Sequence, residues 1–171
     1  MAPDATRLKW VAEPPQAGMR PRPKASKEYE VRLLKQEDLS RGFIETLDNL
    51  SDTADLTPRK AAATFREIRR DSSRAVFVAV REDGEIVGTT TLLIERKFIH
   101  GGGLVGHIED VAVRRGNEGQ GIGGALVTAA ADHARLKRCY KCILDCKEEV
   151  VPFYTRLGFR RHDVGMRLDL G

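Results

Sequence analysis

The chain has 171 residues, of which 41% are hydrophobic and 32% are charged, a composition typical of a folded domain with its own core. No apolar run reaches the roughly 20 residues that a membrane span needs, and no hydrophobic segment follows the first methionine. A membrane anchor and a secretory signal are therefore not expected. The formal net charge is +4, but residues 1–28 hold six basic and only three acidic residues, so most of the excess lies in this tail. That location argues against a nucleic-acid-binding domain.

Residues 1–28 also contain five of the seven prolines. Because such a segment buries little apolar surface, it is predicted to be an extended or flexible basic arm. Residues 29–171 are predicted to form a single domain. The three cysteines are an odd number without a secretion signal, which indicates reduced thiols and a cytoplasmic protein.

The first half of the domain is predicted to contain one strand, two helices and then a hairpin of two strands. A proline at the first helical position after Thr57 marks one helix start, and Asp83-Gly84 is typical of a tight hairpin turn. Apolar spacing supplies the other boundaries. The expected elements are a strand at 29–35, helices at 36–50 and 57–70, and hairpin strands at 75–80 and 86–94.

The second half alternates strands with helices. Its expected elements are strands at 104–113, 140–146 and 159–170, with helices at 121–137 and 148–158. The order β-α-α-β-β-β-α-β-α-β predicts a mixed α/β domain, of the α+β type, whose middle strands are antiparallel.

Five glycines lie between Gly116 and Gly124, where a predicted strand meets a predicted helix. The spacing fits G-x-G-x-x-G, but the strand ends well before Gly119 and only two strands follow, which disfavours a dinucleotide fold. A Walker A loop is excluded because Ala125 and Leu126 follow Gly124. A glycine-rich helix start suits a diphosphate, since it presents several N–H groups near the positive end of the helix dipole. A turn without a ligand remains an open alternative.

The three cysteines Cys139, Cys142 and Cys146 follow His133, so a four-ligand zinc site is one interpretation. Cys142 and Cys146 alternate on one face of a β-like run, however, which favours buried strand cysteines and no metal.

The sequence resembles the GNAT superfamily of acyl-CoA-dependent N-acetyltransferases, whose acetyl-CoA loop reads Arg/Gln-x-x-Gly-x-Gly/Ala after a central strand. Within the superfamily it is similar to the amino-sugar branch, which acetylates D-glucosamine 6-phosphate. The resemblance runs from Tyr29 to the C-terminus. It is carried by "ERKFIH" (95–100), "GHIEDVAV" (106–113), "GQGIGG" (119–124), "CYKCILDC" (139–146) and "PFYTRLGF" (152–159).

The resemblance implies a GNAT fold, a mixed central sheet flanked by helices in which two neighbouring parallel strands splay apart around acetyl-CoA. These strands would be "IEDVAV" and "YKCILD". Backbone groups of Val111 and Val113 would bind the thioester and pantetheine. The loop amides would bind the diphosphate, and they belong to Gly119, Gln120, Gly121, Ile122, Gly123 and Gly124.

The resemblance also implies catalytic roles for three residues. Asp145 would hold the substrate amine, Glu109 with Asp145 would relay its proton, and Tyr154 would protonate the CoA thiolate. Without the resemblance, a solvated strand end and a packed aromatic would explain the same residues. The implied substrate-binding residues are Ser51, Lys97, Phe98, Ile99, His100, Glu109, Asp110, Asp145 and Arg167.

The implied partners are a small amino-sugar phosphate and a second copy of the chain, bound through the last strand. Three positions depart from the family pattern: Glu118 opens the cofactor loop, Val150 replaces an asparagine, and Asp169 stands where relatives have an arginine. These departures leave two alternatives open. One is a GNAT acetyltransferase for another small amine, and the other is a non-catalytic CoA-binding regulatory module.

Overall fold

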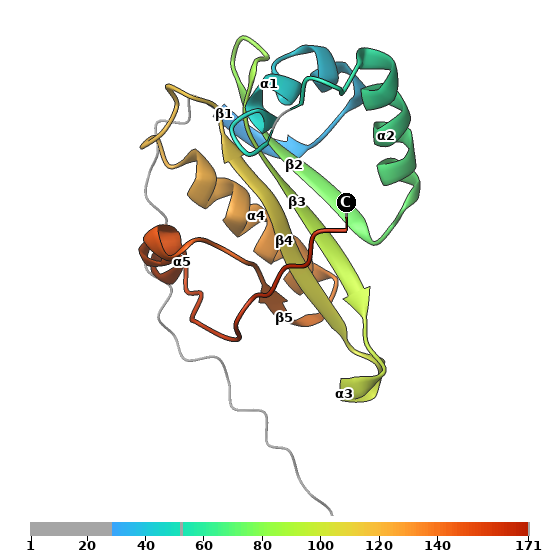
Figure 1. Ribbon diagram of the computed structural model, residues 1–171, viewed down its shortest axis with the longest axis vertical. Helices are drawn as coiled ribbons and strands as arrows, with labels where there is room; N and C mark the ends of the chain where they lie inside the picture. Colours follow the sequence, from blue (N-terminus) through green and yellow to red (C-terminus); the bar gives the residue numbers. More distant parts are fainter. Residues whose placement is uncertain (1–28, 52, 171) are drawn as a thin grey trace, which may run out of the picture.

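The computed structural model describes residues 29–51 and 53–170, so the predicted arm at 1–28 lies outside the described residues. A five-stranded sheet in the order β1-β2-β3-β4-β5 forms the centre of the domain (Figure 1). Strands β1 to β4 are antiparallel and β5 is parallel to β4. The strands are β1 (Tyr29–Leu33), β2 (Arg74–Arg81), β3 (Ile86–Arg96), β4 (Leu104–Val113) and β5 (Cys139–Ile143). The helices are α1 (Phe43–Leu47), α2 (Pro58–Arg70), α3 (Ile99–Gly102), α4 (Ile122–Leu136) and α5 (Val151–Arg156).

The core has two layers because side chains alternate across a strand. Phe77 and Ala79 of β2 pack in a cluster with the apolar face of α4, whereas their neighbours Val76 and Val78 pack in a second cluster with α1 and α2. Helix α4 therefore covers one face of the sheet, while α1 and α2 cover the part of the other face formed by β1, β2 and the start of β3 (Figure 1). The mixed α/β architecture expected from the element order is confirmed.

Several predicted elements are confirmed closely. Helix α2 begins after Thr57, whose hydroxyl accepts a hydrogen bond from the Lys60 amide. The hairpin of β2 and β3 turns at Gly84, which has a positive φ of 84°. Strand β4 and helix α4 match their predicted ranges within a residue.

The prediction of one continuous helix over 36–50 is wrong. A 3₁₀ turn at Gln36–Ser40 is separated from α1 by Gly42, whose φ of 91° breaks the helix. This left-handed φ favours glycine, and a Cβ here would also lie 3.1 Å from the Ile86 carbonyl oxygen, a close approach to backbone. The short helix α3, between β3 and β4, was not predicted.

The predicted last strand, residues 159–170, is wrong for the single chain. No backbone–backbone hydrogen bond among the described residues involves 160–170, and a strand forms only when its backbone groups bond to a neighbour. The apolar residues of this segment are 82–95% exposed, and they are Val164, Met166, Leu168 and Leu170.

Strand β5 also ends earlier than predicted, at Ile143. Cys146 is therefore exposed beyond the strand, which corrects the expectation that it is buried. Cys142 within the strand is half-buried.

A buried ion pair anchors β1 to the 3₁₀ turn. Both oxygens of the Asp38 carboxylate accept hydrogen bonds from the Arg32 guanidinium, at 2.7 and 2.8 Å, and the Lys35 amide donates a third at 2.7 Å. Burial alone would raise the pKa of Asp38, but the bonds from Arg32 and Lys35 outweigh it and hold this pKa below its usual value. Asp38 is fully buried, so the pair is expected to contribute to stability mainly when both charges are present.

Asp38→Asn should lower the free energy of unfolding by about 3–5 kcal/mol at neutral pH, because it leaves the Arg32 charge without its partner. Since the folded-state pKa of Asp38 lies below the unfolded one, the contribution is complete above the unfolded pKa of about 3.9 and is lost as pH falls through the folded pKa. Urea unfolding at several pH values measures this. Glu37→Gln, at an exposed neighbour, is the control. A difference between wild type and Asp38→Asn that stays constant down to pH 2 would contradict this role.

Candidate active site

The candidate site lies where β4 and β5 stop pairing. The parallel ladder runs from Leu104 opposite Cys139 to His107 opposite Ile143, and β5 ends there. Strand β4 continues through Val113, so its outer edge beyond His107 has no neighbouring strand within residues 29–51 and 53–170. This divergence is the splay that the family resemblance implies.

A bulge lies in the unpaired part of β4. Asp110 has a φ of +52°, uncommon for a residue with a side chain, and the register with β3 shifts between Thr89 and Thr91. The Thr90 hydroxyl donates to the Glu109 carbonyl at 3.0 Å, a side-chain contact between β3 and β4 at the irregularity. Bulges redirect side chains, and here Glu109 remains half-buried while Asp110 is exposed.

The glycine loop leads from β4 into α4. Gly116, Gly119 and Gly121 all have positive φ values, between 78° and 84°, which explains why the turn needs glycine. Ala125 makes the first helical hydrogen bond, to the Gly121 carbonyl, so the preceding helical amides have no partner within the helix. These amides lie at the positive end of a 15-residue helix, an arrangement that binds anions.

The Glu118 carboxylate bends back into this loop. Its Oε2 accepts a hydrogen bond from the Gly116 amide at 2.7 Å. The side chain therefore bonds to an amide of the loop itself, at the beginning of the turn and before the amides that start α4. Glu118, which departs from the family pattern, therefore does not occupy the amides at the start of α4.

Three carboxylates gather at the divergence. Burial raises the pKa of Glu109, and the negative charges of Asp110 and Asp145 raise it further, while His107 opposes them. Asp145 follows the last residues of β5, and Glu109 comes from the unpaired part of β4. The structure thus brings Glu109 and Asp145 together from segments far apart in the sequence.

Tyr154 lies on α5, among aromatic side chains. Its ring meets Phe153 edge-on at 4.9 Å and Phe159 at 6.0 Å, measured between ring centroids. Burial raises the pKa of Tyr154, with a smaller contribution from Cys146, so the phenol is protonated at neutral pH. Cys146 is a neighbour of Tyr154 that the sequence analysis considered only as a strand cysteine or a zinc ligand.

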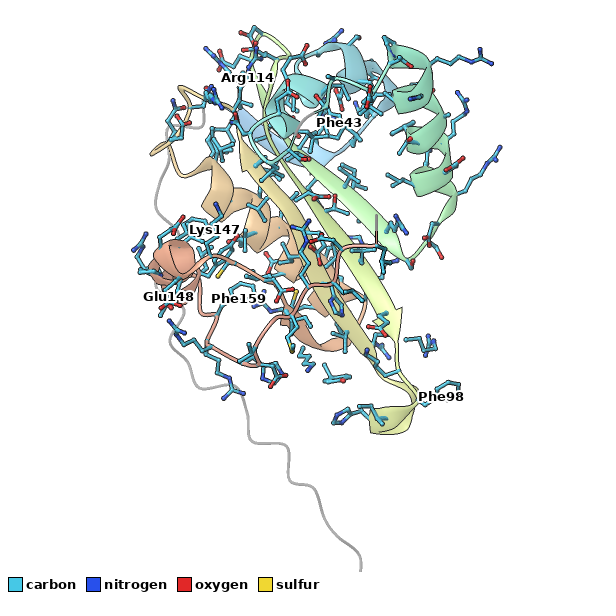
Figure 2. The ribbon with its side chains drawn as sticks, in the orientation of Figure 1. Phe43, Phe98, Arg114, Lys147, Glu148 and Phe159 are labelled. Atoms are coloured by element: carbon cyan, nitrogen blue, oxygen red, sulfur yellow. The ribbon has the colours of Figure 1, made fainter. Side chains whose placement is uncertain are left out.

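The predicted substrate-binding residues around α3 lie far from these groups in the same chain. Figure 2 shows Phe98 at the tip of the β3–β4 hairpin and Arg114 at the opposite end of β4. Phe98 and Ile99 are exposed, and Lys97 pairs with Glu95 at 2.6 Å. The His100 ring lies against Tyr140 of β5, with 4.3 Å between centroids.

Among the described residues, no hydrogen bond or ion pair joins Ser51 or Arg167 to these carboxylates. Gly165, two residues before Arg167, nevertheless lies next to Asp145, since a Cβ at this glycine would be 3.2 Å from Oδ1. Ser51 is exposed in the loop after α1. The Arg167 guanidinium pairs with Asp169, through Nε at 2.7 Å and Nη2 at 2.5 Å. The predicted substrate-binding Arg167 therefore contacts Asp169, the residue that stands where relatives have an arginine.

Sequence reasoning missed Asn49. Its side-chain amide donates to the Val113 carbonyl at 2.5 Å, so one of the backbone groups expected to bind the cofactor already has a protein partner. Asn49 is one of several polar residues around the end of α1, so the local sequence carries no signal for this contact.

Within residues 29–51 and 53–170, no group of three or more His, Cys, Asp and Glu side chains could hold a metal ion. Burial raises the pKa of the Cys142 thiol to about 11, so it is neutral at physiological pH. In the same part of the chain, no helix has the length and apolarity that crossing a membrane requires.

Comparison with known proteins identifies close relatives of this arrangement. The profile of the Acetyltransferase (GNAT) family matches residues 39–159. A glucosamine 6-phosphate N-acetyltransferase of Trypanosoma brucei brucei is 41% identical over 144 residues, which cover 84% of this chain and 97% of that protein. Glucosamine 6-phosphate N-acetyltransferase 1 of Oryza sativa subsp. japonica is 38% identical over 143 residues, covering 82% and 86%. The crystal structure of the Arabidopsis thaliana glucosamine-6-phosphate N-acetyltransferase has a TM-score of 0.81 and 34% identity, over 84% of this chain and 99% of that one.

Proposed function

Because this chain belongs to the GNAT family of acetyltransferases, we propose that it transfers the acetyl group of acetyl-CoA to the amine of D-glucosamine 6-phosphate. The products are N-acetyl-D-glucosamine 6-phosphate and CoA. The observation that carries the proposal is the gap between β4 and β5, which has anion-binding amides at one end and the carboxylates Glu109 and Asp145 at its side.

The cofactor is proposed to lie along the free edge of β4. Its diphosphate meets the amides of 119–124 at the start of α4, and its pantetheine arm follows the backbone of Val111 and Val113. A β4 amide near Val111 polarises the thioester carbonyl and stabilises the oxyanion as the amine attacks. A thioester is already activated, so holding it in line with the amine supplies much of the rate.

Glu109 and Asp145 are proposed to prepare the amine. A sugar ammonium is attracted to this acidic pair, and Asp145 holds it in place. The raised pKa of Glu109 makes its carboxylate a better proton acceptor than an exposed glutamate. Once neutral, the amine nitrogen forms the new bond to the acetyl carbon.

Tyr154 is proposed to complete the reaction. The carbon–sulfur bond breaks as the tetrahedral intermediate collapses, and the leaving CoA sulfur takes the phenolic proton. The nitrogen loses its extra proton at this stage and becomes the neutral amide, and that proton restores the phenol of Tyr154. The phenol is available because its raised pKa keeps it protonated.

The phosphate of the sugar needs cations. Lys97 and His100 lie at the far tip of the β3–β4 hairpin, away from Glu109 in one chain. Arg167 lies in the exposed C-terminal segment, in which Gly165 lies next to the Asp145 carboxylate. We therefore include a homodimer in the proposal, in which the C-terminal segments pair across the two chains. The exposed row of Val164, Met166, Leu168 and Leu170 supports this, because water-exposed apolar residues at every second position suit a strand with one buried face.

The function is tested by CoA release with three acceptors: glucosamine 6-phosphate, unphosphorylated glucosamine and spermidine. The expected result is turnover with glucosamine 6-phosphate at a kcat/KM at least tenfold above the other two, on the order of one lost charge-assisted contact. Equal turnover with all three would sink the sugar-phosphate assignment. Binding of acetyl-CoA without turnover of any acceptor would instead favour a regulatory module.

Tyr154→Phe should lower kcat by about 10²–10⁴-fold, the usual contribution of a general acid, while KM for both substrates stays within about twofold. Steady-state kinetics measures this. Phe153→Leu, at the adjacent aromatic residue, controls for packing on α5. If kcat of Tyr154→Phe equals that of wild type, Tyr154 has no part in the chemistry.

The homodimer is tested by sedimentation of wild type and Leu168→Glu. The charged side chain should shift the wild-type dimer toward monomer, because it adds charge to the apolar row. Asp163→Lys changes an exposed residue of the same segment that is not in the apolar row, so it should leave the dimer intact. A monomeric wild type at micromolar concentration would remove the dimer from the proposal.

A further inference from the structure

Asn49 joins the loop after α1, which carries Ser51, to the end of β4, where the pantetheine arm is proposed to bind. It lies just after α1, in the loop that leads to Ser51 and then to α2. Its Nδ2 donates to the Val113 carbonyl at 2.5 Å, across 64 residues of sequence. Val113 ends β4, immediately before the glycine loop.

The direction of the Val113 carbonyl places its hydrogen bond with Asn49 in the gap between β4 and β5. The amide of Arg114 donates to the Val87 carbonyl on β3 at 2.9 Å. None of the described peptide bonds is cis, and in a trans peptide the carbonyl points away from the N–H of the next residue. The Val113 carbonyl therefore faces away from β3, toward the side where β5 has already ended.

The hydrogen bond from Asn49 leaves the Val113 carbonyl oxygen able to accept another one. A carbonyl oxygen has two lone pairs, so Val113 can accept a second bond while Asn49 holds the first. The loop that carries Asn49 is itself fixed locally, because the Thr53 hydroxyl bonds to Asp48 and the Leu50 amide bonds to the Leu47 carbonyl. The side chain of Asn49 thus links this loop to the free edge of β4.

We propose that Asn49 is a positioning residue for acetyl-CoA. Acting through the Val113 carbonyl, it fixes the last peptide of β4 in the orientation that accepts an amide N–H of the pantetheine arm, and it holds residues 48–51 beside that arm. This inference rests on the proposed function for the identity of the co-substrate. It assigns a role to a residue that the family resemblance does not.

The test compares Asn49→Ala, Asn49→Asp and the matched control Thr53→Ala, which removes a side-chain hydrogen bond of the same loop that does not reach β4. Calorimetry measures the Kd of CoA, and kinetics measures KM for each substrate. Asn49→Ala should raise the Kd of CoA and KM for acetyl-CoA about three- to tenfold, the effect of one hydrogen bond, with KM for the sugar within twofold. Thr53→Ala should leave the Kd of CoA unchanged.

Asn49→Asp separates positioning from packing. The carboxylate has nearly the shape of the amide but no N–H, and its charge opposes the Val113 carbonyl. CoA should therefore bind more weakly to Asn49→Asp than to Asn49→Ala at pH 7. The Asn49→Asp variant should regain affinity relative to wild type as pH falls toward about 4 and the carboxyl gains a proton.

Two outcomes would overturn the inference. One is a Kd of CoA in Asn49→Ala equal to that of wild type. The other is a loss in Asn49→Ala that affects both substrates equally and follows a lowered melting temperature, as a merely structural role predicts. Both differ from a failure of the proposed function, in which the wild-type protein itself would not bind CoA or acetylate the sugar.

Discussion

The length difference between β4 and β5 is the constraint on which the candidate site depends. Beyond the pair His107 and Ile143, β4 stays paired with β3, but among the described residues no strand bonds the backbone N–H and C=O groups on its other edge. Such groups need partners when they are partly buried. A pantetheine arm, which is extended and carries two amide groups, can supply those bonds much as an added strand would. The bulge at Asp110 adds to the effect, because it changes which side chains face the gap.

Two parts of the gap differ in charge. At the end formed by the glycine loop, the free amides and the dipole of α4 favour a diphosphate. At the middle, the half-buried Glu109 shares its surroundings with Asp110 and Asp145, which favours a cationic amine. Glu118 does not reverse this order, because its carboxylate bonds to Gly116 at the start of the loop. The arrangement suits a reaction between an anionic cofactor and an ammonium substrate.

Local sequence signals were sufficient for much of the fold. Thr57 and Pro58 mark the start of α2, Asp83 and Gly84 mark the hairpin turn, and regular apolar spacing marks α4. In each case the physical cause lies within a few neighbouring residues. The family motifs similarly identified Glu109 and Asp145, and the register of β4 and β5 explains why they meet.

The failures arise where distant contacts decide the structure. Gly42 breaks the first helix beside Arg114, which is remote in sequence. The segment 159–170 has the alternation of a strand but no strand partner in one chain. The contact between Asn49 and Val113 depends on how α1 sits over the sheet, and no local pattern reports that.

The central claim is that acetyl-CoA occupies the gap between β4 and β5, with its diphosphate on the glycine loop. Titrating the ¹⁵N-labelled full chain with CoA and following backbone amide shifts tests it most directly. The account predicts that the largest shifts fall on Val111, Val113 and residues 119–124. Saturable shifts confined to the groove beside Tyr29 and Arg81, with the loop amides unmoved, would contradict it.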